Sequence, residues 1–158
     1  MATINQLFGT TAQSITLTLT SITNTSLQQS TAVDNTTNLF MDVKVAVRIK
    51  TASASTSSTG AVNVYAYGTA DTTTPVYSGG ASGSNSAYTA NKDNLIYLGS
   101  IAAVANSTTY DGLFNLARAF GYGGIPAKWG IVVENLSGAT LDASVGSAWY
   151  QGINATVA

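Results

Sequence analysis

The sequence predicts an all-β fold, an antiparallel two-sheet sandwich that is jelly-roll-like and carries one short helix at about 111–120. Serine, threonine, asparagine and 15 glycines supply most of the polarity, and this mixture favours strands and turns over helices. Several short segments alternate apolar and polar residues, which is the period of a half-buried strand. The 158 residues show no shift in composition, so we expect one sandwich domain at 13–158 behind an N-terminal arm at 1–12.

The clearest alternation lies in residues 39–50. Its apolar face consists of Leu39, Met41, Val43, Val45, Val47 and Ile49. The other face carries Asp42, Lys44, Arg48 and Lys50. A shift of one residue in register would bury these four charges, so the facing of this half-buried antiparallel strand is firmly specified.

Further strands are expected at 14–22, 61–69 and 94–104. The first alternates Ile15, Leu17 and Leu19 with threonines. The second should form a long-looped hairpin with the strand at 39–50. Within it, Tyr65 and Tyr67 share the face opposite Val62 and Val64, so both could point outward and be available, or simply pack against the neighbouring sheet. Residues 78–94 form the longest polar stretch, and loops of this length are typically functional or mobile.

The period changes to that of a helix in DGLFNLARAFG. Leu113, Leu116, Ala117 and Phe120 are spaced as on one helix face, with Asp111 as N-cap and Gly121 as the stop. A helix this short is unstable by itself in water. We therefore expect it to lie across the sheets as a lid.

The segment 128–157 holds both tryptophans and the only glutamate. It predicts a hairpin turning at Gly138, whose strands direct apolar side chains inward: Trp129, Ile131 and Val133 first, then Trp149, Ile153 and Val157. Glu134 and Asp142 would lie near its mouth, facing solvent or a neighbouring subunit. Two carboxylates about 5–10 Å apart can hydrolyse glycosides, so a hydrolase is one hypothesis, although no other residues converge there.

Composition removes most catalytic chemistry. The chain has neither cysteine nor histidine, which excludes thiolate nucleophiles, Ser-His-Asp triads and nearly all imidazole or thiolate metal sites. Calcium could use oxygen ligands, but NKDN at 91–94 lacks the spacing of an EF-hand loop. We therefore expect no enzyme activity, no cofactor and no metal.

The surface is predicted to be nearly uncharged. Charged residues make up 8% of the chain and the net charge is −1, which protects a domain poorly against association and indicates a protein that lives in an assembly. The N-terminus lacks the features of a secretion signal and no apolar run could span a membrane. We expect no membrane partner.

Three groups are candidates for partner contacts. Leu7 and Phe8 are apolar in an otherwise polar arm and could anchor the protein. Lys44, Arg48 and Lys50 form a basic row too narrow for nucleic acid, which either guards an edge strand or meets acidic groups on a neighbour. Tyr65 and Tyr67 could pack against a partner or stack on sugars.

The opening MATINQLFGTT and the segment LARAFGYGGIPAKWGIVVENLSGATL…SAWYQGI resemble small virion structural proteins of tailed bacteriophages. The chain is similar in particular to capsid decoration, or cement, proteins with a jelly-roll-like fold, most specifically over residues 113–153. The resemblance implies synthesis in the bacterial cytoplasm, docking on the outside of the capsid, and stiffening of the shell. It also implies two partners, the major capsid protein and further copies in a homotrimer. It offers no catalytic motif to transfer.

Two alternatives stay open. The chain could be a receptor- or glycan-binding domain of a tail fibre or spike, with tyrosines of the 65–67 strand or the 78–94 loop against sugars. It could also be a neck or tail structural protein, which the sequence does not separate from a decoration protein.

Overall fold

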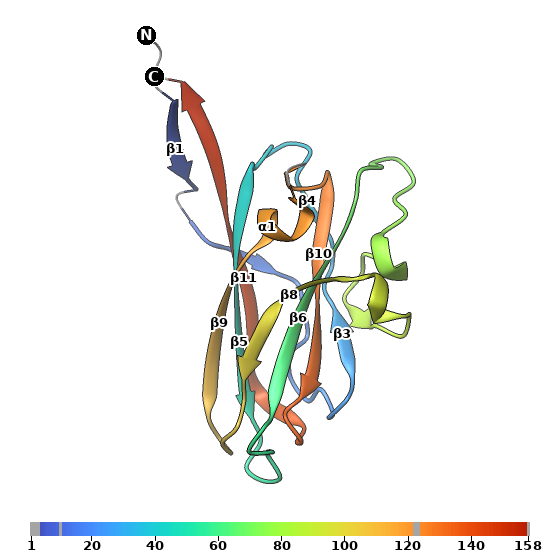
Figure 1. The fold of residues 1–158 in the computed structure, drawn as a ribbon, viewed down its shortest axis with the longest axis vertical. Coiled ribbons are helices and arrows are strands. Elements are labelled where there is room, and N and C mark those ends of the chain that lie inside the picture. The colour runs from blue at the N-terminus through green and yellow to red at the C-terminus, as the bar shows by residue number, and fades with distance from the viewer. Residues whose placement is uncertain (1–3, 10, 122–123, 158) are drawn as a thin grey trace.

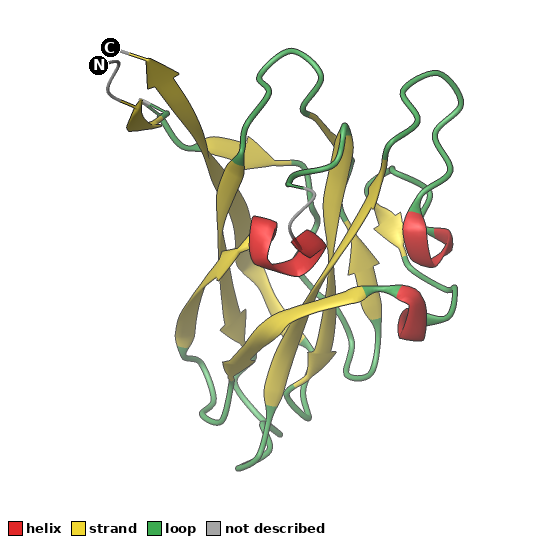
Figure 2. Cartoon of the chain, turned by 45° about the horizontal axis from the view of Figure 1, so that its top comes forward, coloured by secondary structure: helices red, strands yellow, loops and turns green. Residues whose placement is uncertain are grey.

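The computed structural model describes residues 4–9, 11–121 and 124–157, which form a sandwich of two antiparallel sheets (Figure 1). The first sheet comprises β1 (Ile4–Phe8), β2 (Gln13–Ile15), β5 (Asp42–Thr51), β9 (Thr109–Asn115) and β11 (Leu141–Val157). The second comprises β3 (Leu27–Gln29), β4 (Val33–Asp34), β6 (Ala61–Thr69), β7 (Ser86–Ala87), β8 (Ile96–Ala102) and β10 (Lys128–Leu136). Among the described residues there is one α-helix, α1 (Leu116–Phe120), besides the single-turn helices η1 (Ser78–Gly80) and η2 (Lys92–Asn94) (Figure 2). The predicted all-β sandwich is confirmed.

The core lies between the two sheets. The inward residues of β5 and β10 alternate as predicted, from Val43 to Ile49 and from Trp129 to Val133, and all are buried. Trp129 of the second sheet packs edge-on against Tyr150 of the first, with ring centroids 5.3 Å apart. Aromatic contacts of this geometry join the two inner faces.

Two predicted strands are shorter than their alternation suggested. The strand at 39–50 begins only at Asp42, and Leu39 and Met41 are 70% and 62% exposed. The chain turns there, because the Asn35 side chain accepts a hydrogen bond from the Phe40 amide and Leu39 takes a left-handed backbone conformation. In the segment 14–22 only Ser14 and Ile15 join a sheet, although Leu17 and Leu19 are buried.

Neither predicted hairpin forms. β5 pairs with β11 and β9, whereas β6 pairs with β10 and β8. The connections at 52–60 and 137–140 each carry the chain from one sheet to the other, so consecutive strands face each other across the core.

β11 also has a different facing from the prediction. A register irregularity between Leu141 and Gly146 resets its alternation, and Ala148 and Tyr150 point into the core. Trp149 therefore lies on the outer face, opposite Ala46. The side chain of Val157 lies outside the described residues.

The helix begins later than predicted, at Leu116 instead of Asp111. Residues 109–115 form β9, and Asp111 pairs with Arg48 rather than capping a helix. The cap is Asn115, whose side-chain oxygen accepts a hydrogen bond from the Arg118 amide at 3.1 Å. Gly121 ends the helix as predicted, with a φ of 71°. α1 contacts β5 and β8, and so lies across an opening between the sheets.

A two-stranded ribbon projects from one end of the sandwich (Figures 1 and 2). It consists of β1, inside the predicted arm, and the end of β11, with Ile4 opposite Val157 and Phe8 opposite Ile153. The pairing of β5 with β11 stops at Ile153. Beyond that point β11 is supported by β1 alone among the described residues. Residues 1–3 and 10 of the arm lie outside that part of the chain.

Candidate interaction surfaces

The outer face of the second sheet is covered by the chain itself. Residues 78–95, which include η1 and η2, lie beside this sheet in Figure 1 and contribute to a second hydrophobic cluster on it. Its buried members are Tyr67, Ala81, Tyr88, Leu95 and Val132. The long polar stretch of the prediction therefore adds β7 to the edge of the sheet, and its other residues cover part of the outer face.

Tyr67 is fully buried in this cluster, so of the two alternatives it takes ordinary packing and is not available on the outside. Its hydroxyl donates a hydrogen bond to the Ser30 carbonyl at 2.7 Å, and its ring packs edge-on against Tyr77. The ring lies directly over Gly130, where a Cβ would come within 2.3 Å of it. Burial raises the pKa of Tyr67 to about 12, so the hydroxyl is a neutral donor in the fold.

Glu134 lies on the same covered face and is only 3% exposed, which corrects its predicted place at an exposed strand end. Its carboxylate accepts hydrogen bonds from the Tyr65 hydroxyl at 2.8 Å and the Asn63 amide at 3.1 Å, and forms an ion pair with Lys92 of η2. We call these four residues the Glu134 cluster.

The Glu134 cluster holds its carboxylate as an anion. Burial raises the pKa of Glu134, but the donors Lys92, Tyr65 and Asn63 outweigh it, and the pKa lies below its ordinary value. Burial and the neighbouring carboxylate raise the pKa of Tyr65 to about 12. A carboxylate held ionised by three donors is a poor general acid. The hydroxyl of half-buried Tyr65 donates to this carboxylate, so it is not free to bind a partner.

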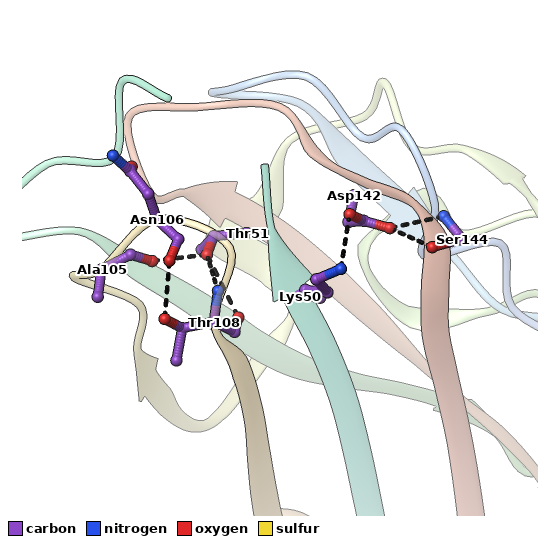
Figure 3. A network of polar contacts seen from close by, with 7 residues as sticks. All are labelled: Lys50, Thr51, Ala105, Asn106, Thr108, Asp142 and Ser144. Atoms are coloured by element: carbon purple, nitrogen blue, oxygen red, sulfur yellow. Dashed lines mark hydrogen bonds and ion pairs between the residues drawn. The ribbon is translucent and has the colours of Figure 1, made fainter. Parts of the chain in front are cut away.

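Asp142 has separate partners in the other sheet (Figure 3). It forms an ion pair with Lys50 at 3.1 Å and accepts hydrogen bonds from the Ser144 hydroxyl and amide. These contacts, those of Ser144 first, lower the pKa of Asp142 to about 2. Glu134 and Asp142 thus lie on different sheets with different partners, and do not form the carboxylate pair that glycoside hydrolysis requires.

The basic row is neutralised within the chain. Lys44 lies 3.6 Å from Asp42, Arg48 makes two hydrogen bonds to Asp111, and Lys50 pairs with Asp142. β5 lies between β11 and β9, so the interpretation that these residues guard an edge strand is wrong. The row leaves no surplus of positive charge for a partner.

The outer face of the first sheet carries an apolar row between these ion pairs. Trp149, Ala46 and Leu113 lie opposite one another across β11, β5 and β9. Leu113 is 72% exposed. The Arg48 guanidinium lies 5.9 Å from the centre of the Trp149 ring. We call these three residues the Trp149 row.

The ribbon places both predicted anchor residues at the surface. Leu7 and Phe8 are 53% and 51% exposed, and as neighbours in a strand they point to opposite faces. No charged side chain occurs in β1 or at positions 143–157 of β11. A hollow of about 360 Å³ lies at the base of the ribbon, lined by Gln6, Met41, Asp42, Ile153, Asn154 and Ala155. An isolated two-stranded ribbon is at best marginally stable in water.

A larger hollow of about 570 Å³ opens between the edge strands β8 and β9, beside α1. Tyr97 and Leu113 expose apolar surface at this hollow, and Asn115 and Arg118 are the polar residues among those that line it. Tyr97 packs edge-on against Tyr65 at 5.6 Å. An exposed aromatic ring beside a guanidinium and an amide can contact a sugar.

Comparison with known proteins gives no relative: no protein-family model matches the chain, and no curated protein is similar to it in sequence. The part of the chain that the structure describes has no cluster of three or more acidic, histidine or cysteine side chains that could hold a metal ion. No helix in the described ranges is long and apolar enough to cross a membrane.

Proposed function

We propose that this chain is a non-enzymatic virion structural protein that binds the outside of a tailed-phage capsid and stabilises the shell, as a decoration (cement) protein does. In this proposal it is made in the bacterial cytoplasm, assembles as a homotrimer and contacts the major capsid protein. The observation that carries the proposal is the projecting, uncharged ribbon with exposed Leu7 and Phe8.

The physical argument is that the sandwich is complete and the ribbon is not. The body has a continuous core between its sheets, whereas Leu7 and Phe8 of the ribbon are exposed, one on each face. Burying a leucine or phenylalanine side chain contributes about 1.5–3 kcal/mol. Two such residues on a projecting element are suited to anchor the domain in a partner, and the low charge of the whole chain suits dense packing on a surface.

The test uses particles of the encoding phage that lack this protein. The purified chain should bind them, and the double variant Leu7→Ser, Phe8→Ser should bind at least tenfold more weakly in a cosedimentation assay. Leu39→Ser is the control, because Leu39 is also a largely exposed leucine but lies outside the ribbon. Full occupancy by the double variant would contradict the role of the ribbon. Location of the native protein at the neck or tail would replace the capsid proposal with that alternative.

A second candidate is a glycan-binding domain of a tail fibre or spike. The hollow beside exposed Tyr97 favours it, whereas the burial of Tyr67 removes half of the aromatic pair first considered. This candidate expects binding on a host glycan array that Tyr97→Ala abolishes and Val76→Ala, another exposed apolar position, leaves intact. Failure to bind any host glycan would end it.

A further inference from the structure

The backbone of the ribbon shows which of its polar groups lack partners. Gly9 lies opposite Gly152 by continuation of the β1–β11 register, and its amide donates to the Gly152 carbonyl at 2.9 Å. Hydrogen-bonded and non-hydrogen-bonded pairs alternate in an antiparallel ladder. The pair Leu7–Asn154 is therefore bonded, whereas the pair Gln6–Ala155 directs its amide and carbonyl groups outward.

One observation checks this alternation. Ile153 belongs to the outward-directed set, and its carbonyl accepts a hydrogen bond from the Met41 amide on the far side of β11. Past Ile153 the same edge of β11 has no strand beside it among the described residues. In the described ranges the outer edge of β1 has no neighbouring strand either. The ribbon thus carries two unpaired edges, one on each side.

These edges also lack the protection that exposed strands normally carry. Natural edge strands are blunted by charged side chains, prolines or bulges. β1 and the end of β11 contain neither charge nor proline, and their pairing runs without a register shift. In addition, the Asn154 side-chain oxygen is buried and has no hydrogen-bond partner in the described part of the chain. Both edges of the ribbon are therefore suited to pair with a further strand.

We propose that the ribbon is completed by further copies of this chain, the outer edge of β1 in one copy pairing with the outer edge of β11 in the next. If the copies are related by rotation about an axis along the ribbon, all β1 strands run one way and all β11 strands the other. Every new contact is then antiparallel, like the pairing within one copy. Three copies close a six-stranded barrel, in which no edge remains.

A second copy fits these edges better than a foreign strand does. The two edges have nearly the same length, and pairing them head to tail uses both, whereas one added foreign strand would leave the other edge open. The absence of charge means that identical ribbons do not repel each other. The number three rests on the proposed function, while the pairing of the edges rests on the ribbon alone.

The test removes one outward amide at a time from the full-length chain. Gln6→Pro deletes a donor on the β1 edge and Ala155→Pro deletes one on the β11 edge, and neither removes a hydrogen bond within the ribbon. Native mass spectrometry at micromolar concentration should show three times the chain mass of 16.1 kDa for the wild type, and single chains for each proline variant. Gln6→Ala and Ala155→Ser keep the amides and should stay trimeric.

Mixing the two proline variants distinguishes the head-to-tail contact from a symmetric one. Each variant retains the edge that the other has lost, so the mixture should form one-to-one dimers although each alone is monomeric. A monomeric wild type, or self-association that survives Ala155→Pro, would overturn the proposal. An unchanged melting temperature in both variants would show that the sandwich is folded. Capsid binding is measured separately, so failure of this test leaves the proposed function standing.

Discussion

The two outer faces of the sandwich differ in how far the chain completes them. On the second sheet Val132 of the central strand β10 is fully buried, because residues 78–95 lie over it. On the first sheet Leu113 of β9 is largely exposed, and the charged residues around it pair with one another. One face is thus a second core and the other is an ordinary solvent face with an apolar row. The same strand pattern therefore occurs in both environments.

The two faces should also differ in what their side chains do, stabilising the fold on the covered face and contacting partners on the open face. Substitutions on the covered face should act on folding, whereas substitutions on the open face and the ribbon should act on association.

Tyr67→Ala should lower the free energy of unfolding by about 3–5 kcal/mol, the usual cost of removing a large buried aromatic side chain. The substitution leaves a cavity over Gly130 and removes the hydrogen bond to the Ser30 carbonyl. Urea denaturation followed by tryptophan fluorescence measures the change. Tyr97→Ala is the matched control, because Tyr97 is an exposed tyrosine of the same sheet. Equal losses in the two variants would show that the covered face is not a core.

Glu134→Gln should lower the free energy of unfolding by about 1–2 kcal/mol at neutral pH, because it removes the charge that holds Lys92, Tyr65 and Asn63. The effect stays in this range because the Lys92 side chain is 43% exposed and water screens the ion pair. Denaturation curves at several pH values measure it.

The stabilisation by the Glu134 carboxylate should also depend on pH. The pKa of Glu134 is lower in the fold than its ordinary value of 4.5, so the advantage of the wild type is full above pH 4.5 and is lost as the pH falls through the folded pKa. Asp142→Asn is the comparison on the open side, where the carboxylate side chain is 21% exposed against 4% for Glu134. A wild-type advantage that persists at strongly acidic pH would show that the Glu134 carboxylate is not its source.

Leu113→Ser should change the free energy of unfolding by no more than about 0.5 kcal/mol, as is usual for surface substitutions. The side chain lies in the Trp149 row and contributes little to the core. Thermal denaturation beside the wild type measures this effect. A loss of several kcal/mol would mean that the first sheet is covered by contacts between copies in solution.

The alternation of apolar residues predicted the fold class and the inner faces of β5 and β10, but not the facing of β11, where Trp149 lies on the outer face. It placed Val43 through Ile49 and Trp129 through Val133 correctly, because the cost of burying charge fixes the facing of these strands. It did not predict which strands are neighbours. An alternation of period two specifies which face of a strand is buried but not which strand it pairs with. The pattern therefore wrongly predicts a hairpin of β5 and β6, whereas the connection at 52–60 crosses from one sheet to the other.

The sequence pattern does not predict whether the outer face of a sheet is covered or exposed to solvent. Tyr67 and Glu134 alternate outward as predicted, but whether outward means solvent depends on where residues 78–95 fold, and no local pattern specifies that. One signal was present. The run from Trp129 to Val133 is apolar at nearly every position, which is typical of a strand buried on both faces. Leu116 fits both the helical spacing and the alternation of the strand before it. The pattern therefore does not show where the strand ends, and it wrongly predicts Asp111 as the helix cap instead of a residue of β9.

The length of β11 has a mechanical consequence. This one strand of 17 residues, roughly 55 Å at the usual rise per residue, runs without a chain break from the tip of the ribbon to the far end of the sandwich. A force that separates Ile4 from Val157 would open the ribbon one residue pair at a time, as a zipper opens. A pull along the ribbon would instead load the whole β5–β11 ladder in shear, where many hydrogen bonds must yield together. The domain should therefore resist tension along its long axis while its tip peels readily.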